Sequence, residues 1–253
     1  MKLTALLLLA LWPAVAFAGN YQETRNLELP AAGVHLLSVR CGAGGLTIQG
    51  VGGTDMIRVT AEIESEGTDK DEFQLLVDKL IQLDLRREHN QARLFSEARI
   101  LPLTNIEARI HLNIQLPVNM NIKIIDGSGS IDVTNIIGNL SIDDESGAIK
   151  ARNITGRIRI EDGSGDIEIE DVQGRLEIVD GSGKIVIQNV TGDVTITDAS
   201  GSIEVNDIGG SVTVSDGSGS IDIYRVKKNV FIRQPGSGAL DIDGVQGLVT
   251  IRE

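Results

Sequence analysis

Residues 158–187 read IRIEDGSGDIEIEDVQGRLEIVDGSGKIVI, and this stretch decides the fold. Gly165, Gly174 and Gly183 are nine residues apart, and isoleucine or leucine stands two and four places after each of them. A fixed period of this kind indicates stacked repeats, because each unit can bury its apolar face only against its neighbours. The stretch therefore predicts a repetitive all-β architecture.

The same period extends through the second half of the chain. Its glycines are Gly129, Gly138, Gly147, Gly156, Gly165, Gly174, Gly183, Gly192, Gly201, Gly210 and Gly219, followed after one interruption by Gly238 and Gly247. Two halves of nine residues alternate, one with an Asp-x-Ser-Gly corner and one with Asn or Asp before its glycine. We therefore predict a right-handed parallel β-solenoid with eighteen-residue rungs, each made of two short strands and two tight corners.

The N-terminal half is less regular. Residues 1–18 have the basic start, short apolar centre and Ala-x-Ala end of an export signal, and we expect them to be removed. Residues 19–33 are polar and are predicted to be a flexible lead-in. Residues 34–253 are predicted to form one solenoid domain, irregular over 34–119 and regular over 120–253. One helix is expected at about 68–81, capped by Thr68 with Asp71.

Charge and composition exclude several function classes. The formal net charge is −13, which argues against nucleic acid and anionic lipid as partners, because both require clustered Lys and Arg. After the export signal, no stretch approaches the ~20 apolar residues of a membrane span. Cys41 is the only cysteine, so no internal disulfide can form, and its place in an alternating strand predicts a buried, unreactive side chain.

These features together resemble a known family. The order is an export signal, a Gly-rich opening strand pair, a variable insertion, an alternating strand that ends at Leu116-Pro117, and tandem Ser-Gly-x-Ile-x-Ile and Val-x-Gly-x-Val-x-Ile halves. The chain resembles a family of bacterial exported β-solenoid proteins that are candidate adhesins and whose domain has no assigned function. The resemblance implies an envelope or extracellular location and no established enzymatic reaction.

Two ladders within the repeats suggest chemistry. The acidic one consists of Asp126, Asp144, Asp162, Asp180, Asp198 and Asp216. Calcium would relieve the repulsion between stacked carboxylates, but aspartate in such turns normally caps its own backbone, and this second interpretation is favoured. The repeated serines have no histidine within the repeats to act as a base, so we predict that they are structural.

One rung departs from the repeat pattern. Residues 224–235 read YRVKKNVFIRQP and carry Lys228 in place of the repeat glycine. The stretch gathers cations and two aromatic rings on an acidic protein, which suggests a partner-binding patch. Its residues would be Tyr224, Arg225, Lys227, Lys228, Phe231 and Arg233. The other interpretation, a local cap that protects the sheet edge, is favoured.

We conclude from the sequence that the protein is a non-catalytic, exported scaffold, periplasmic or secreted, that binds an envelope or extracellular protein or glycan and needs no cofactor. Edge-to-edge self-association is a further expectation for an open stack of strands. Two alternatives remain: a calcium-dependent binding module that uses the acidic ladder, and a polysaccharide-active enzyme, since parallel β-helices host such chemistry.

Overall fold

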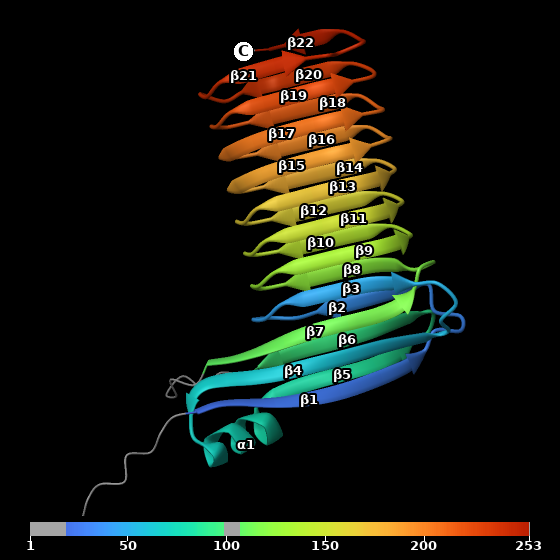
Figure 1. The fold of residues 1–253 in the computed structure, drawn as a ribbon, viewed down its shortest axis with the longest axis vertical. Coiled ribbons are helices and arrows are strands. Elements are labelled where there is room, and N and C mark those ends of the chain that lie inside the picture. The colour runs from blue at the N-terminus through green and yellow to red at the C-terminus, as the bar shows by residue number, and fades with distance from the viewer. Residues whose placement is uncertain (1–18, 99–106, 253) are drawn as a thin grey trace, which may run out of the picture.

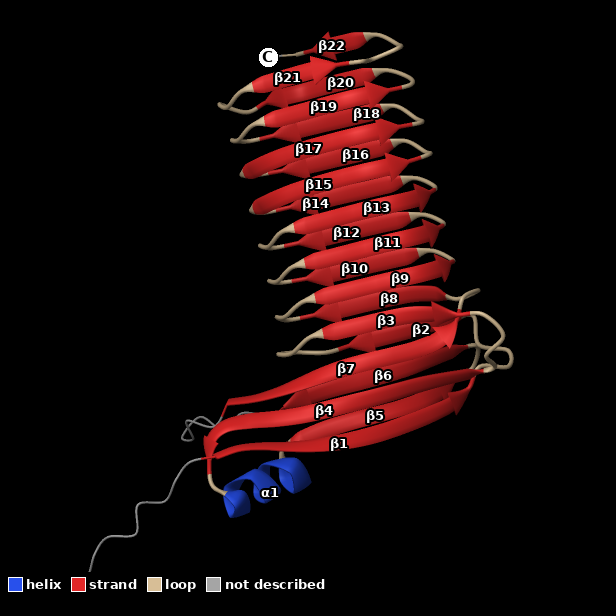
Figure 2. Ribbon diagram, in the orientation of Figure 1, coloured by secondary structure: helices blue, strands red, loops and turns tan. Residues whose placement is uncertain are grey.

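The computed structural model describes residues 19–98 and 107–252, which form two eleven-stranded β-sheets and one α-helix. The predicted export segment, residues 1–18, lies outside the described residues. Strands of successive rungs stack along the long axis of the molecule, from the N-terminal part to the C-terminus (Figure 1). Figure 2 shows the helix at the N-terminal end of this stack, away from the C-terminus.

Both sheets are continuous along the molecule. Sheet A has the spatial order β1 (Gly19–Pro30), β4 (Met56–Thr68), β7 (Glu107–Pro117), β3 (Leu46–Val51), β9 (Ile131–Ile137), β11 (Ile149–Thr155), β13 (Ile167–Gln173), β15 (Gly183–Val190), β17 (Gly201–Ile208), β19 (Ile221–Val226) and β21 (Leu240–Asp243). Sheet B has the order β22 (Val249–Ile251), β20 (Val230–Pro235), β18 (Val212–Asp216), β16 (Val194–Asp198), β14 (Leu176–Asp180), β12 (Ile158–Asp162), β10 (Leu140–Asp144), β8 (Asn121–Asp126), β2 (Leu36–Arg40), β6 (Gln91–Ala98) and β5 (Ile81–Glu88).

The repeat sets the pairing register in both sheets. In sheet A, Ile149 pairs with Ile167 and Ile167 pairs with Ile185, so partners are eighteen residues apart and their strands are parallel. The same spacing joins the strands of sheet B, for example Ile158 with Leu176. The predicted parallel β-solenoid with eighteen-residue rungs is therefore confirmed.

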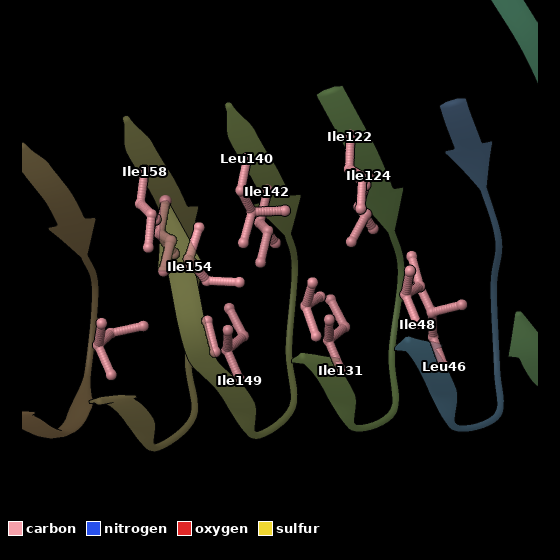
Figure 3. Close-up of a cluster of buried hydrophobic side chains, with 14 of the residues drawn as sticks. Leu46, Ile48, Ile122, Ile124, Ile131, Leu140, Ile142, Ile149, Ile154 and Ile158 are labelled. Atoms are coloured by element: carbon pink, nitrogen blue, oxygen red, sulfur yellow. The ribbon is translucent and has the colours of Figure 1, made fainter. Parts of the chain in front are cut away.

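The core is a narrow layer of branched aliphatic side chains between the two sheets. Figure 3 shows Leu46, Ile131 and Ile149 of sheet A and Ile122 and Leu140 of sheet B pointing into the same layer. All five are at most 2% exposed. Full burial of one such side chain contributes roughly 1.5–3 kcal/mol, so the column of repeated apolar pairs carries most of the stability of the stack.

The corners of the rungs need two different backbone solutions. At Gly165 the φ angle is +150°, and a methyl group would overlap the carbonyl oxygen of Gly147 in the preceding rung. At Asn153 the φ angle is +58°, in the left-handed region that asparagine tolerates better than most residues. Its side-chain amide donates to Asn135 of the preceding rung at 2.6 Å. The alternating Gly and Asn or Asp corners of the sequence therefore follow from sterics.

The first rung is separated in sequence from the rest of the stack. Strand β3 lies beside β9 with Leu46 opposite Ile131, and β2 lies beside β8 with Leu36 opposite Asn121. The intervening segment supplies β4 to β7 and the helix, which extend both sheets on the other side of this rung. The Gly-rich opening strands are thus a true rung of the stack, and Ala43 between them bridges Ser128.

The expected flexible lead-in over residues 19–33 is wrong. Most of it is strand β1, which pairs antiparallel with β4 from Gly19 to Pro30. Side chains from Tyr21 onward alternate between half-buried and exposed, but Glu23 and Arg25 take half-buried positions and pair with each other at 2.8 Å. Because Glu23 and Arg25 interrupt the inner row of Tyr21, Leu27 and Leu29, the hydrophobic alternation that marks a strand is broken in the sequence.

The predicted helix is present as α1 (Lys70–Lys79), with a different cap. Asp69 caps it, accepting from the backbone N–H of Glu72 at 2.8 Å, whereas Thr68 and Asp71 were expected to do so. Phe73, Leu76 and Val77 are buried on one face of the helix. Phe73 stacks on Tyr21 with ring centroids 5.7 Å apart, so the helix covers apolar surface at the N-terminal end.

Candidate functional site

The six aspartates of the Asp-x-Ser-Gly halves form a column inside one edge of the solenoid. Each is the last residue of a sheet B strand and pairs with the aspartate of the adjacent rung. Asp126, Asp144, Asp162, Asp180, Asp198 and Asp216 are all between 1% and 7% exposed. Carboxylates are rarely buried without a charged partner, so this column is the least ordinary feature of the repeats.

One oxygen of most of these carboxylates caps the corner. Oδ1 of Asp162, Asp180 and Asp198 accepts a hydrogen bond from the backbone N–H two residues later, at 3.3, 3.2 and 3.1 Å. Asp216 repeats this bond to Ser218 at 3.0 Å. The turn-capping interpretation is therefore confirmed for these positions. The other oxygen, Oδ2, has no hydrogen-bond partner among the described residues in any of these four carboxylates.

Burial shifts the acidity of the column. Loss of solvent, followed by the charges of Asp144 and Asp180, raises the pKa of Asp162 to about 7. The pKa of Asp198 is raised to about 6 for the same reasons. Burial also raises the pKa of Asp126 to about 6, with a smaller contribution from Asp144. A buried carboxylate with an unpartnered oxygen binds a proton more readily than an exposed one.

The geometry of the column does not favour calcium. Calcium takes six to eight converging oxygen ligands, whereas this column supplies one buried carboxylate per rung, partly committed to the backbone. Within residues 19–98 and 107–252, no group of three His, Cys, Asp or Glu side chains lies close enough together to hold a metal ion. The column is better described as a set of buried corner caps.

Cys41 occupies the place of an aspartate at the start of the column. Strand β2 pairs with β8 so that Cys41 follows Arg40 as Asp126 follows Ile125. The thiol lies beside Asp126. Burial raises the pKa of the thiol far above the ordinary value, with a smaller contribution from the charge of Asp126. A thiol held in the protonated form is unreactive. The side chain is half-buried, so the predicted full burial is wrong, whereas the raised pKa agrees with the predicted unreactive thiol.

The irregular rung does not gather its six candidate residues into one patch. Tyr224 lies on sheet A and donates to Asp241 at 2.8 Å, whereas Phe231 and Arg233 lie in β20 of sheet B. Successive residues of a strand point to opposite faces, and the two sheets form opposite faces of the solenoid. The aromatic rings therefore cannot anchor the same partner surface, and the prediction of a single patch needs correction.

The remaining residues of this rung lie at the corner between the sheets. Arg225 has a φ angle of +57° and forms an ion pair with Asp207 at 2.7 Å, so its charge is already matched. Lys227 lines a shallow hollow of about 660 Å³ beside Arg225. Lys228 is exposed near Asp193, whose pKa it helps to lower. The corner thus presents two exposed lysines that have no ion pair within the described part of the chain, separate from a small groove at Phe231 and Arg233.

One histidine comes close to a repeat serine, which the sequence did not indicate. His111 and Ser130 line the same hollow of about 360 Å³. The ring accepts the backbone N–H of Gly45 at Nδ1, at 2.9 Å, and its Nε2 lies 2.8 Å from Glu64. Both ring nitrogens are therefore engaged, and neither is free to take a proton from a serine hydroxyl. The arrangement fixes β3 against β7.

A family model agrees with this fold. Residues 46–243 match the Toastrack DUF4097 model, which covers more than half of the chain. The chain belongs to the Toastrack DUF4097 family. The expected family of unknown function is thereby confirmed. The sequence matches no curated protein.

Solved structures resemble this Toastrack protein over most of its length. A candidate lipid-binding protein from Parabacteroides distasonis is 15% identical, with a TM-score of 0.52 and coverage of 91% of this chain and 97% of the other. A candidate adhesin from Bacteroides fragilis is 14% identical, with a TM-score of 0.43 and coverage of 90% and 96%. At 15% identity, the first of these two structures supports the fold alone. Among the described residues, no helix has the length and apolar character needed to span a bilayer.

Proposed function

We propose that this Toastrack protein is an exported, non-catalytic scaffold, adhesin-like in its role, that binds an envelope or extracellular partner through the outer faces of its two sheets. The observation that carries the proposal is the register of the stack. Because the rungs from β8 to β19 repeat at eighteen residues, their outward side chains form straight rows along two long, flat faces. Such faces suit the binding of extended partners, as in other repeat proteins.

The chemistry of the outer faces supports a scaffold. Many outward charges are already matched across rungs, such as Lys150 with Glu168 at 2.7 Å and Arg175 with Asp193 at 3.1 Å. Arg152 pairs with Asp132 at 2.9 Å. Exposed pairs of this kind contribute little to stability and perform no acid–base chemistry. The engaged nitrogens of His111 argue in the same direction, and we favour neither catalysis nor calcium binding.

Two measurements test the proposal. Fluorescently labelled protein should bind envelope material from its own cells in a saturable way, and excess unlabelled protein should compete. A panel of ester, glycoside and peptide substrates should show no turnover above that of heat-denatured protein. Hydrolysis without saturable binding would overturn the proposal. N-terminal sequencing of the exported protein tests the location, since we expect the mature chain to begin at Gly19.

A further inference from the structure

A basic groove lies on the outer face of sheet B, where the N-terminal insertion meets the first rungs. Its volume is about 790 Å³, and strands β5, β6, β2 and β8 form its floor. The outward side chains that line it are Arg86 and Asp84 of β5, Arg93 and Phe95 of β6, Ser38 and Arg40 of β2, and Lys123 and Ile125 of β8. We call this the basic groove.

The strand register brings these residues together. Arg86 is opposite Arg93, which is opposite Ser38, which is opposite Lys123, so they form one row across four strands. Asp84, Phe95, Arg40 and Ile125 form the next row in the same way. The residues come from three separate stretches of the sequence, because the insertion places β5 and β6 beside β2. No run of basic residues in the sequence indicates this site.

The charge of the basic groove opposes that of the whole protein. Four cations line it beside the carboxylates of Asp84 and Glu88, on a chain with a formal net charge of −13. Glu88 holds Arg86 and Arg93, each at 2.9 Å. Arg40 and Lys123 are exposed, and neither has an ion pair within the described part of the chain. The basic groove therefore offers two free cations beside two oriented guanidinium groups.

We propose that the basic groove binds an acidic oligosaccharide, one whose sugars carry carboxylates. Guanidinium groups bind carboxylates through paired hydrogen bonds, which suits Arg40 and Arg93. Phe95 and Ile125 supply an apolar surface between the cations, on which the C–H face of a sugar ring can lie. A volume of this size fits a short oligomer. This inference rests on the proposed scaffold function and names a ligand class for it.

Two other anionic partners fit the basic groove less well. An extended acidic peptide would gain most by adding a strand to a free sheet edge, but the basic groove lies on the face of sheet B, with paired strands beneath it. An anionic bilayer is flat and would be repelled by the rest of the acidic surface, whereas the basic groove is concave. An oligosaccharide recognised by side chains alone needs neither an edge nor a flat surface.

Calorimetry with an oligogalacturonate of about six sugars tests the proposal on the full mature chain. We expect binding that weakens as salt rises, and no binding of a neutral glucan oligomer of the same length. The double variant Arg40→Glu and Lys123→Glu should lose about tenfold to 100-fold in affinity, because each removes a charge-assisted contact. Both side chains are exposed and unpaired, so the variant should melt like the wild type, which circular dichroism checks.

The matched control reverses two exposed lysines at the other end of the molecule. Lys227→Glu with Lys228→Glu changes the net charge equally and should leave the affinity unchanged. Equal affinity in wild type and the Arg40 and Lys123 variant would overturn the inference, as would loss of binding in the control alone. Polyglutamate binding as tightly as the glycan, or vesicles of phosphatidylglycerol doing so, would also overturn it. If envelope material still binds the groove variant normally, the scaffold function stands and only the proposed glycan site fails.

Discussion

Replacing Asp162 by Asn should stabilise the protein at neutral pH, because it removes one charge from the buried column. Asn keeps the oxygen that accepts from Ser164 N–H, so the corner stays capped. Its amide also gives the position of the unpartnered Oδ2 two donors, which can face the carboxylates of Asp144 and Asp180. The substitution is close in shape, so the packing of the rung should not change.

The pKa of Asp162 sets the size and the pH range of the effect. The folded state raises this pKa from 3.8 to about 7. Below pH ~4 Asp162 is protonated in both the folded and the unfolded state, so it does not lower the free energy of unfolding. As pH rises towards 7 the unfolded state loses its proton first, so stability falls, and above 7 the full penalty remains. The difference corresponds to roughly 4 kcal/mol at most, and we expect about 2–4 kcal/mol because the neighbouring carboxylates titrate together.

Thermal melting between pH 4 and pH 8 measures this effect. For a chain of this size the gain corresponds to about 5–10 °C at pH 8, with little difference at pH 4. The control Asp143→Asn makes the same chemical change on the exposed face of the neighbouring rung and should leave the pH dependence as in the wild type. If the difference in melting temperature between the wild type and Asp162→Asn stays the same from pH 4 to pH 8, burial does not govern the charge of this column.

Three further changes test the packing and the corners. Ile167→Asp places an unpaired carboxylate between the sheets and should cost several kcal/mol in chemical denaturation, whereas Glu168→Ala on the outer face should stay within about 1 kcal/mol. Gly165→Ala should abolish cooperative melting or strongly lower the melting temperature, because the methyl group overlaps the backbone of the preceding rung. A melting temperature equal to that of the wild type would show that the corner is looser than described. Phe73→Ala should cost about 3–5 kcal/mol in the same denaturation assay, and a negligible loss would mean that α1 does not cover the N-terminal end.

The sequence was sufficient for the regular rungs because one rule repeats in every one of them. Ile167 is fully buried, as its place two residues after a glycine predicts. The same argument failed where polar residues interrupt the hydrophobic pattern. Glu23 and Arg25 occupy half-buried positions and satisfy each other, so hydrophobicity alone could not mark β1.

The candidate sites were harder to predict because they depend on pairing between distant segments. The residues of the irregular rung are close together in sequence, but the corner between β19 and β20 places Tyr224 and Phe231 on opposite sheets. The basic groove shows the converse. Arg93 and Lys123 lie in the same row, one strand apart, only because β2 lies between β6 and β8. Periodicity predicts which residues face outward. It does not predict which distant strand will lie beside them.

The eighteen-residue register also makes the length of this protein adjustable in fixed steps. Ile149, Ile167 and Ile185 hold equivalent places, so removing or duplicating eighteen residues within the regular rungs rejoins like with like. Each step changes the length of the molecule by about 4.8 Å. A change of nine residues would instead put a sheet B strand in the place of a sheet A strand, since Ile158 of β12 lies nine residues after Ile149 of β11. The length of the protein, from its helix-covered N-terminal end to its last strand, is therefore set by the number of whole rungs.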